Sequence, residues 1–146
     1  MLEPVFAALG LLNNIILIII FLLRKDRMDL VNRFGWVYFL FAIPAVYALY
    51  LVQQEQKDVR FTIFLGIFLA FLAIEALYDW ILKLSFREKP DWRILTPYVA
   101  LYISSNYGFV VMTWHYYSLA LGIVLLVLFI IQIIANLRSH PKPAPN

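Results

Sequence analysis

Long apolar stretches separated by short charged ones make up most of this chain. The apolar stretches lack the polar positions at period 2 or 3.6 that mark the solvent side of soluble strands and helices. Each is close to the roughly 20 residues that a helix needs to cross a hydrocarbon core of about 30 Å. The pattern therefore predicts an all-α, multi-spanning transmembrane helix bundle with five spans, at residues 4–23, 34–52, 61–86, 94–114 and 118–137.

The segments between these spans have the polarity and aromatic content of membrane boundaries. Residues 24–33 and 53–60 are too charged or polar to be embedded, so both are predicted to be loops. In the second span, Trp36 and Tyr38 lie near one end and Tyr47 and Tyr50 near the other, as in the aromatic belts of membrane interfaces. We therefore expect a single domain over residues 1–137, followed by a proline-rich, disordered tail at 138–146.

The composition supports the membrane assignment and excludes several chemistries. Hydrophobic residues make up 64% of the chain and charged residues 14%, against about 25% charged in soluble domains. There is no cysteine, which rules out disulfides, thiolate nucleophiles and cysteine-ligated metals. The HExxH, GxSxG and glycine-rich phosphate motifs are also absent. The sequence thus predicts no metal, no cofactor and no identifiable catalytic residue, and enzymatic activity is not favoured.

The distribution of basic residues predicts an orientation. If the N-terminus lies outside, the first loop, the third loop and the tail are cytoplasmic, and only Lys57 and Arg60 remain outside. Positive charge concentrates on the cytoplasmic side of membrane proteins, so this orientation is preferred, with the C-terminus in the cytoplasm. No basic region precedes the first span, which is typical of an uncleaved anchor in the plasma or inner membrane. We read the net charge of +3 as a topology signal that also favours contact with anionic lipid, and nucleic-acid binding is not expected.

A four-span arrangement is the alternative. The turn expected at 114–117 is short and has no Gly, Pro or Asn. The helix would instead break at 104–108 and continue as one long helix over 109–137, which would move the tail outside. Five spans place more Lys and Arg on one side, so we prefer five.

Charged residues inside the third span mark the most informative position. Glu75 lies about 21 Å below the outer end of this span at 1.5 Å per residue, somewhat inward of the midplane. A charge at that depth costs at least ~2.5–3.5 kcal/mol, so the carboxyl is expected to face the bundle interior. Asp79 lies one turn deeper and is expected to pair with Lys83 at i,i+4. Glu75 is interpreted either as a structural carboxyl or as an ion, proton or polar headgroup site.

Polar side chains of other spans fall at a similar depth. Asn13 and Asn14 interrupt the first span, residues 104–106 are polar in the fourth, and Gln132 lies in the inner part of the fifth. Each one alone is best explained by hydrogen bonds between helices. Their agreement in depth with Glu75 predicts a substrate- or ion-binding site made of these residues: Glu75, Asp79, Asn14, Ser105, Asn106 and Gln132.

Two classes of function are consistent with such a site. The first is a small carrier, or a carrier subunit, in which Glu75 binds a proton, a cation or a polar solute. The second is a non-transporting protein, either a membrane-embedded lipid-modifying enzyme or an accessory subunit with a purely structural polar belt. An enzyme would need a second reactive group, from Asp79, Tyr78 or Tyr102. With five spans and no internal repeat, a homodimer or a membrane partner is expected.

Overall fold

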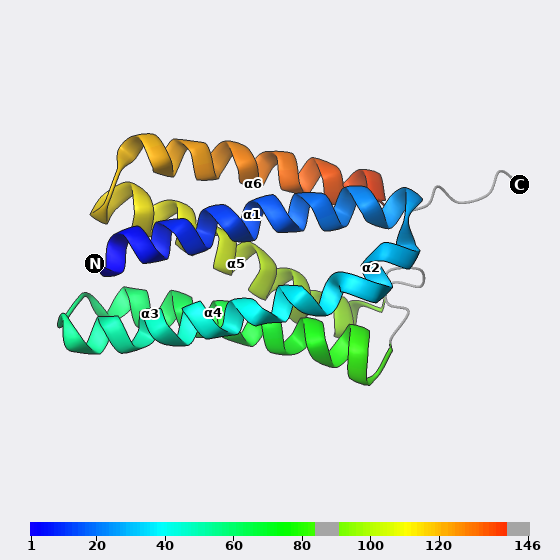
Figure 1. Ribbon diagram of the computed structural model, residues 1–146, viewed down its shortest axis with the longest axis horizontal. Helices are drawn as coiled ribbons and strands as arrows, with labels where there is room; N and C mark the ends of the chain where they lie inside the picture. Colours follow the sequence, from blue (N-terminus) through cyan, green and yellow to red (C-terminus); the bar gives the residue numbers. More distant parts are fainter. Residues whose placement is uncertain (84–90, 140–146) are drawn as a thin grey trace, which may run out of the picture.

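The computed structural model describes residues 1–83 and 91–139, and this part of the chain is helical without any strand. Figure 1 shows the helices side by side along one long axis. The elements are α1 (Leu2–Asp26), α2 (Met28–Phe34), the 3₁₀ helix η1 (Gly35–Phe41), α3 (Ala42–Gln54), α4 (Val59–Ala76), the π-helical turn η2 (Leu77–Ile81), α5 (Trp92–Tyr116) and α6 (Leu119–Ser139).

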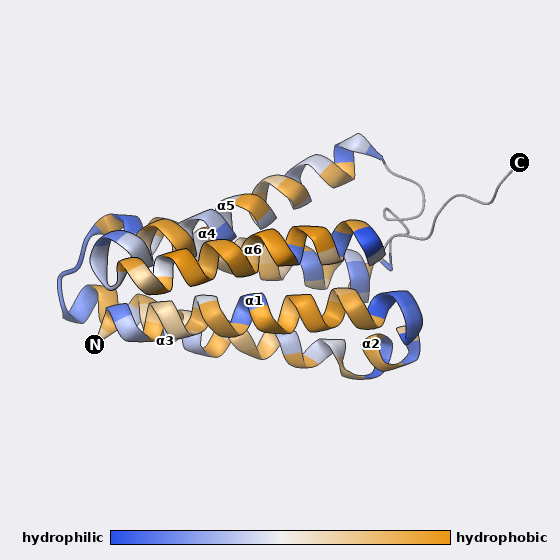
Figure 2. Cartoon of the chain, turned by 90° about the horizontal axis from the view of Figure 1, so that it is seen from above, coloured by the Kyte–Doolittle hydropathy of each residue, from blue (hydrophilic) through white to orange (hydrophobic). Residues whose placement is uncertain are grey.

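Five continuous helical segments are long and apolar enough to cross a membrane, as the hydrophobicity pattern predicts. They are Leu2–Asp26, Met28–Gln54, Val59–Ile81, Trp92–Tyr116 and Leu119–Ser139. Apolar residues run along the middle of the helices in Figure 2, and hydrophilic residues gather towards their ends. The all-α, membrane-type class predicted from the sequence is confirmed.

Each helix packs against particular neighbours, and within the described residues α5 contacts three of the other spanning helices. Helix α1 makes its most extensive contact with α6, and α5 lies against α4, α6 and α1. Helix α3 completes the bundle by packing on α4 and α1. Side chains from four of the five spans therefore meet at the inner face of α5.

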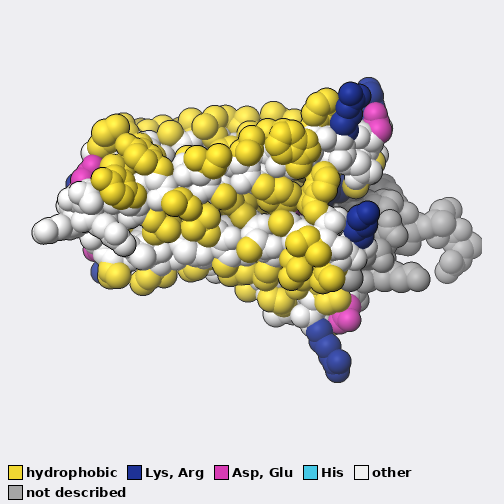
Figure 3. Space-filling model, turned by 60° about the horizontal axis from the view of Figure 1, so that its bottom comes forward, with side chains coloured by type: hydrophobic (Ala, Val, Ile, Leu, Met, Phe, Trp, Pro, Cys, Tyr) yellow, Lys and Arg dark blue, Asp and Glu magenta, His cyan; other side chains and the backbone are white. Residues whose placement is uncertain are grey.

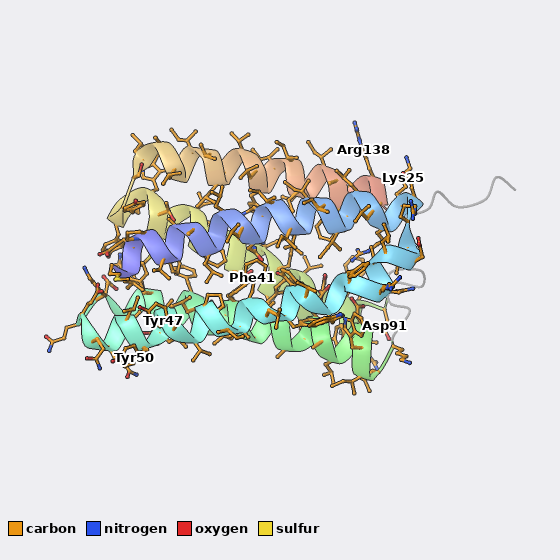
Figure 4. All side chains as sticks on the ribbon, viewed as in Figure 1. Lys25, Phe41, Tyr47, Tyr50, Asp91 and Arg138 are labelled. Atoms are coloured by element: carbon orange, nitrogen blue, oxygen red, sulfur yellow. The ribbon has the colours of Figure 1, made fainter. Side chains whose placement is uncertain are left out.

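The two ends of the bundle differ in charge. Figure 3 shows a largely hydrophobic surface with most of its Lys and Arg side chains at one end. Lys25 and Arg138 lie at that end in Figure 4, whereas Tyr47 and Tyr50 lie at the opposite end. Both tyrosines are exposed, as expected for an aromatic belt. We call the end with Lys25 and Arg138 the basic end.

The second span begins earlier than predicted. The segment expected to be a loop contains helix α2, and η1 continues it without interruption into α3, so the span runs over Met28–Gln54. Pro44 lies near the start of α3, where it has no N–H to donate to the carbonyl of Leu40. The chain is wound as the 3₁₀ helix η1 just before this proline.

The third span ends before its predicted limit at residue 86. Helix α4 changes into the π-helical turn η2, which ends at Ile81, and Lys83 has a left-handed φ of 48°. Lys83 lies beyond the end of this helix, so the helical i,i+4 alignment on which the predicted Asp79–Lys83 pair was based is not present. Residues 84–86 of the predicted span lie outside the described residues.

Helix α5 is continuous where the four-span alternative placed a break. Residues 104–108 are helical, and the chain turns instead at Tyr117–Ser118. The Ser118 hydroxyl accepts a hydrogen bond from the Leu121 N–H at 3.3 Å and so caps the start of α6. Gly122 allows the close approach, because a Cβ there would lie 2.8 Å from the Trp114 Cα. The predicted disordered tail is helical at Arg138 and Ser139, and the rest of it lies outside the described residues.

Phenylalanine rings fill the bundle on the side away from the basic end. Phe6 contacts both Phe61 and Phe109 with ring centroids 5.1 Å apart, and Phe109 contacts Phe68 at the same distance. All four rings are fully buried. A Cβ on Gly10 would lie 2.9 Å from the Phe109 ring, so this glycine lets α1 approach α5 closely.

Candidate functional site

A chain of hydrogen bonds crosses the bundle interior from η1 through α1 to α5. The Tyr38 hydroxyl donates to Asn13 Oδ1 at 2.6 Å, and Asn13 Nδ2 donates to Asn106 Oδ1 at 3.4 Å. Asn106 Nδ2 then donates to the Tyr102 carbonyl oxygen at 2.9 Å. Both asparagines have no exposed surface. The sequence prediction that Asn13 and Asn106 share a depth in the bundle is confirmed by their direct contact.

A second link joins α5 to α6 on the same side of the bundle. The Tyr102 hydroxyl donates to Gln132 Oε1 at 2.7 Å, and Gln132 is fully buried. Tyr102 lies one turn nearer the basic end of α5 than Asn106. Because Gln132 is bonded to the Tyr102 hydroxyl, it also lies nearer the basic end than Asn106 does. We refer to Asn13, Tyr38, Tyr102, Asn106 and Gln132 together as the polar network.

Asn14 and Ser105 are buried next to the network but bond within their own helices. Asn14 Nδ2 donates to the Gly10 carbonyl at 2.9 Å, and Ser105 Oγ donates to the Tyr102 carbonyl at 3.0 Å. The acceptor Asn14 Oδ1 and the donor Gln132 Nε2, both buried in this region, have no hydrogen-bond partner among the described residues. They leave one acceptor and one donor for a further hydrogen-bonding group.

Glu75 lies on the buried face of α4, with only 7% of its surface exposed. Its carboxylate interacts electrostatically with the phenols of Tyr38 and Tyr102, which places it beside the polar network. The prediction that this carboxyl faces the bundle interior is confirmed, and Tyr78, one turn further along, is buried as well. The buried face does not continue beyond that point, since Leu82 is 53% exposed. The π-helical turn and the early helix end remove Leu82 from the interior.

Asp79 does not share the environment of the polar network. It lies in η2, where it is only half-buried, one turn nearer the basic end than Glu75. The structure thus brings Asn106 and Gln132 into hydrogen bonds of the network, places Glu75, Asn14 and Ser105 beside it, and leaves Asp79 at its edge.

Three network residues were absent from the predicted site: Asn13, Tyr38 and Tyr102. Asn13 was named from the sequence only as a polar residue at a depth similar to that of Glu75. Tyr38 was assigned to a membrane interface, but it is 3% exposed and bonded to Asn13. This prediction is wrong because α2 extends the second span by more than a turn, so Tyr38 lies inside it. Tyr102 was noted only as a reactive group for an enzyme. A spacing signal for it exists, since Tyr102 and Asn106 are four residues apart and share a helix face.

The described residues contain no group of three His, Cys, Asp or Glu side chains that could hold a metal ion. The polar network consists of amides and phenols, which are neutral at physiological pH. The site can therefore hydrogen-bond a polar group, while Glu75 supplies negative charge or carries a proton.

No protein family, no curated protein and no solved structure matches this chain. Its function is therefore inferred from the residues of the bundle interior and from their surroundings.

Proposed function

We propose that this multi-pass membrane protein is a small carrier, or a subunit of one, that binds a proton, a cation or a polar solute at Glu75. The observation that carries the proposal is the burial of this carboxyl beside phenols and amides of three other spans. A buried acid in a membrane is costly, and such residues commonly line ion or substrate pathways.

The unpartnered atoms near the network support a bound solute. Asn14 Oδ1 and Gln132 Nε2 lack partners among the described residues, and burying such atoms without a hydrogen bond costs ~1–3 kcal/mol each. A ligand carrying a donor and an acceptor would remove that cost. Asn14, Ser105, Asn106 and Gln132 are accordingly the polar residues proposed to line the site with Glu75, and Asp79 lies on the route towards the basic end.

An accessory role is the second candidate, and a specific observation favours it. The amides of Asn13, Asn106 and Gln132 already bond to side chains of neighbouring helices, as expected for residues that hold a bundle together. In that case the network would stabilise the fold and Glu75 would bind nothing. The two candidates predict different behaviour of a Glu75 variant.

The membrane arrangement is part of the proposal. Five crossings with the N-terminus outside would put the basic end in the cytoplasm of a cell with a plasma or inner membrane. Lys25, Arg138 and their neighbours would then face anionic lipid headgroups. A homodimer or a membrane partner is proposed as well. Many carriers work by rocking one structural repeat against another, and no internal repeat was found in this sequence.

The test uses N,N′-dicyclohexylcarbodiimide, which modifies protonated carboxyls in apolar surroundings. Purified protein in detergent is labelled between pH 5 and pH 9, with and without added cations, and the mass shift at Glu75 is read after digestion. A binding role predicts that labelling falls as the pH rises and that a bound cation protects the residue. The matched control is Asp29→Asn, at an exposed carboxyl outside the site, which should leave labelling of Glu75 unchanged.

Thermal unfolding of Glu75→Gln separates the two candidates. The substitution keeps the side-chain shape and removes the charge. A binding site would therefore lose the rise in melting temperature that added cations give the wild type, while the melting temperature without cations stays within a few degrees. A large drop in melting temperature, together with cation-independent labelling of the wild type, would support the accessory role and contradict the carrier.

A further inference from the structure

Buried aromatic residues lie on both sides of Glu75 along its helix. Phe71 lies one turn before Glu75, and Tyr78 lies one turn after it. The Tyr98 ring of α5 contacts both, with centroid distances of 5.6 Å to Phe71 and 6.3 Å to Tyr78. Tyr78 and Tyr98 are stacked with 26° between their planes. The carboxyl-bearing turn thus faces a continuous aromatic wall.

A second set of rings extends this wall across the bundle. Tyr102 contacts Phe71 at 5.8 Å, Phe129 of α6 at 6.1 Å and Phe21 of α1 at 6.4 Å. Since Glu75 interacts electrostatically with Tyr102, this ring belongs to the surroundings of the carboxyl. We call Phe71, Tyr78, Tyr98 and Tyr102 the aromatic cage. Their side chains are buried, so a cation beside them would be screened from water.

The oxygen atoms near Glu75 suit an organic cation better than a metal ion. Hard cations such as Ca²⁺ need six or more oxygen ligands, and Mg²⁺ needs near-octahedral geometry. The phenol of Tyr38 and the amide of Asn106 are already used in hydrogen bonds within the network. What the cage offers instead is ring faces, which attract ammonium groups through their quadrupoles.

We propose that the Glu75 site takes a monovalent organic cation, an amine or a quaternary ammonium, whose charge meets the carboxylate while its alkyl groups lie against the aromatic cage. The proposal rests on the function proposed above for Glu75 and specifies its ligand class. The combination of one carboxylate with several ring faces is the chemistry by which proteins recognise quaternary ammonium groups.

The test measures binding of benzyltrimethylammonium to the purified full-length chain in detergent by isothermal titration calorimetry. The isosteric neutral compound neopentylbenzene and equal concentrations of Na⁺ serve as comparison ligands, and protein-free micelles give the blank. Saturable binding of benzyltrimethylammonium, with at least tenfold weaker binding to Glu75→Gln, is expected. Tyr98→Leu should weaken binding by a few-fold to about 30-fold, the range of a lost cation–π contact.

Two controls separate ring loss from general damage. Tyr98→Phe keeps the ring and should bind within about threefold of the wild type. Tyr107→Leu removes an exposed ring from the same helix, outside the cage, and should have no effect on affinity. Gel filtration and thermal scans check that each variant is folded, and Phe71→Leu replaces Tyr98→Leu if the latter fails that check.

The outcomes distinguish the ligand class from the function. Glu75-dependent binding of Na⁺ without binding of benzyltrimethylammonium would overturn the organic-cation class and leave the carrier proposal standing. Equal binding of neopentylbenzene, or binding unchanged in Glu75→Gln, would show an apolar cavity and overturn the inference. If no cation binds, cations do not protect Glu75 from the carbodiimide and its labelling does not fall as the pH rises, both proposals fail.

Discussion

The hydroxyl of Tyr38 lies 2.6 Å from Asn13 Oδ1 and joins the first two membrane spans at the centre of the bundle. The contact depends on η1, because the 3₁₀ winding before Pro44 sets the direction in which Tyr38 leaves its helix. It also completes the pairing of Asn13, whose amide nitrogen donates to Asn106 on α5. One phenol thereby holds three spans at a common depth.

Replacing Tyr38 with Phe should lower stability without changing the fold. The substitution keeps the ring but leaves Asn13 Oδ1 buried without its donor, and a lost interhelical hydrogen bond is worth ~0.5–1.5 kcal/mol. Thermal unfolding in detergent measures the difference. Tyr47→Phe is the matched control, since Tyr47 is exposed and its hydroxyl belongs to no network. An equal effect of both variants would contradict the importance of the Tyr38–Asn13 bond.

Replacing Gly10 with alanine and replacing Gly66 with alanine should have different effects on stability. A Cβ on Gly10 would lie 2.9 Å from Phe109, whereas one on Gly66 would meet nothing within 4 Å. Gly10→Ala should therefore cost ~1–3 kcal/mol through overpacking. Gly66→Ala should be neutral or stabilise the protein by up to ~1 kcal/mol through helix propensity. Thermal unfolding of both variants checks this, and a destabilised Gly66→Ala would show a contact outside the single chain.

Asp58 connects the loop before α4 to the end of α5, and its protonation should loosen this end. Its side chain accepts a hydrogen bond from the Tyr116 hydroxyl at 2.6 Å and another from the Arg60 N–H at 2.8 Å. The Tyr116 bond is the main reason that the pKa of Asp58 lies below its ordinary value of 3.8. A lowered pKa means that the stabilisation is present above about pH 4 and is lost as the pH falls below it.

Tyr116→Phe tests this linkage. At pH 6 the variant should melt at a lower temperature than the wild type. The gap should shrink as the pH is lowered towards 2, because Asp58 takes up a proton as the pH falls through its lowered pKa. Lys57 provides a second, opposite dependence, because its bond to Glu3 raises its pKa above 10.5 and its contribution is lost only at more alkaline pH. A gap that does not change between pH 6 and pH 2 would contradict the role assigned to the Asp58–Tyr116 bond.

The hydrophobicity pattern was enough to predict the helices, because spans of this length and apolarity have few alternatives in a bilayer. The cost of burying a charge was enough to predict that Glu75 faces inward. Boundaries were less predictable. The charged segment before Phe34 forms helix α2, since its charges lie near the bundle end, where their side chains reach the surface.

The site itself was only half predictable. Asn106 and Gln132 are unusual in apolar spans and stand out by type. Tyr38 does not, because tyrosine at a span end is ordinarily interfacial. Its burial follows from the length of α2 and from the position of Asn13 on another helix, and neither is visible in the local sequence. The helical alignment predicted for Asp79 and Lys83 is absent for a similar reason, since nothing in their spacing indicates a π-helical turn.

The orientation can be tested directly, because the chain has no cysteine and needs no prior substitutions. Gln54 and Lys25 are both exposed and lie at opposite ends of the bundle. With the N-terminus outside, a membrane-impermeant maleimide should label Gln54→Cys in intact cells and label Lys25→Cys only after permeabilisation. The basic residues near Lys25 make this the electrostatically favoured arrangement. The reverse labelling pattern would invert the bundle and place the entry to Glu75 from the basic end on the outer surface.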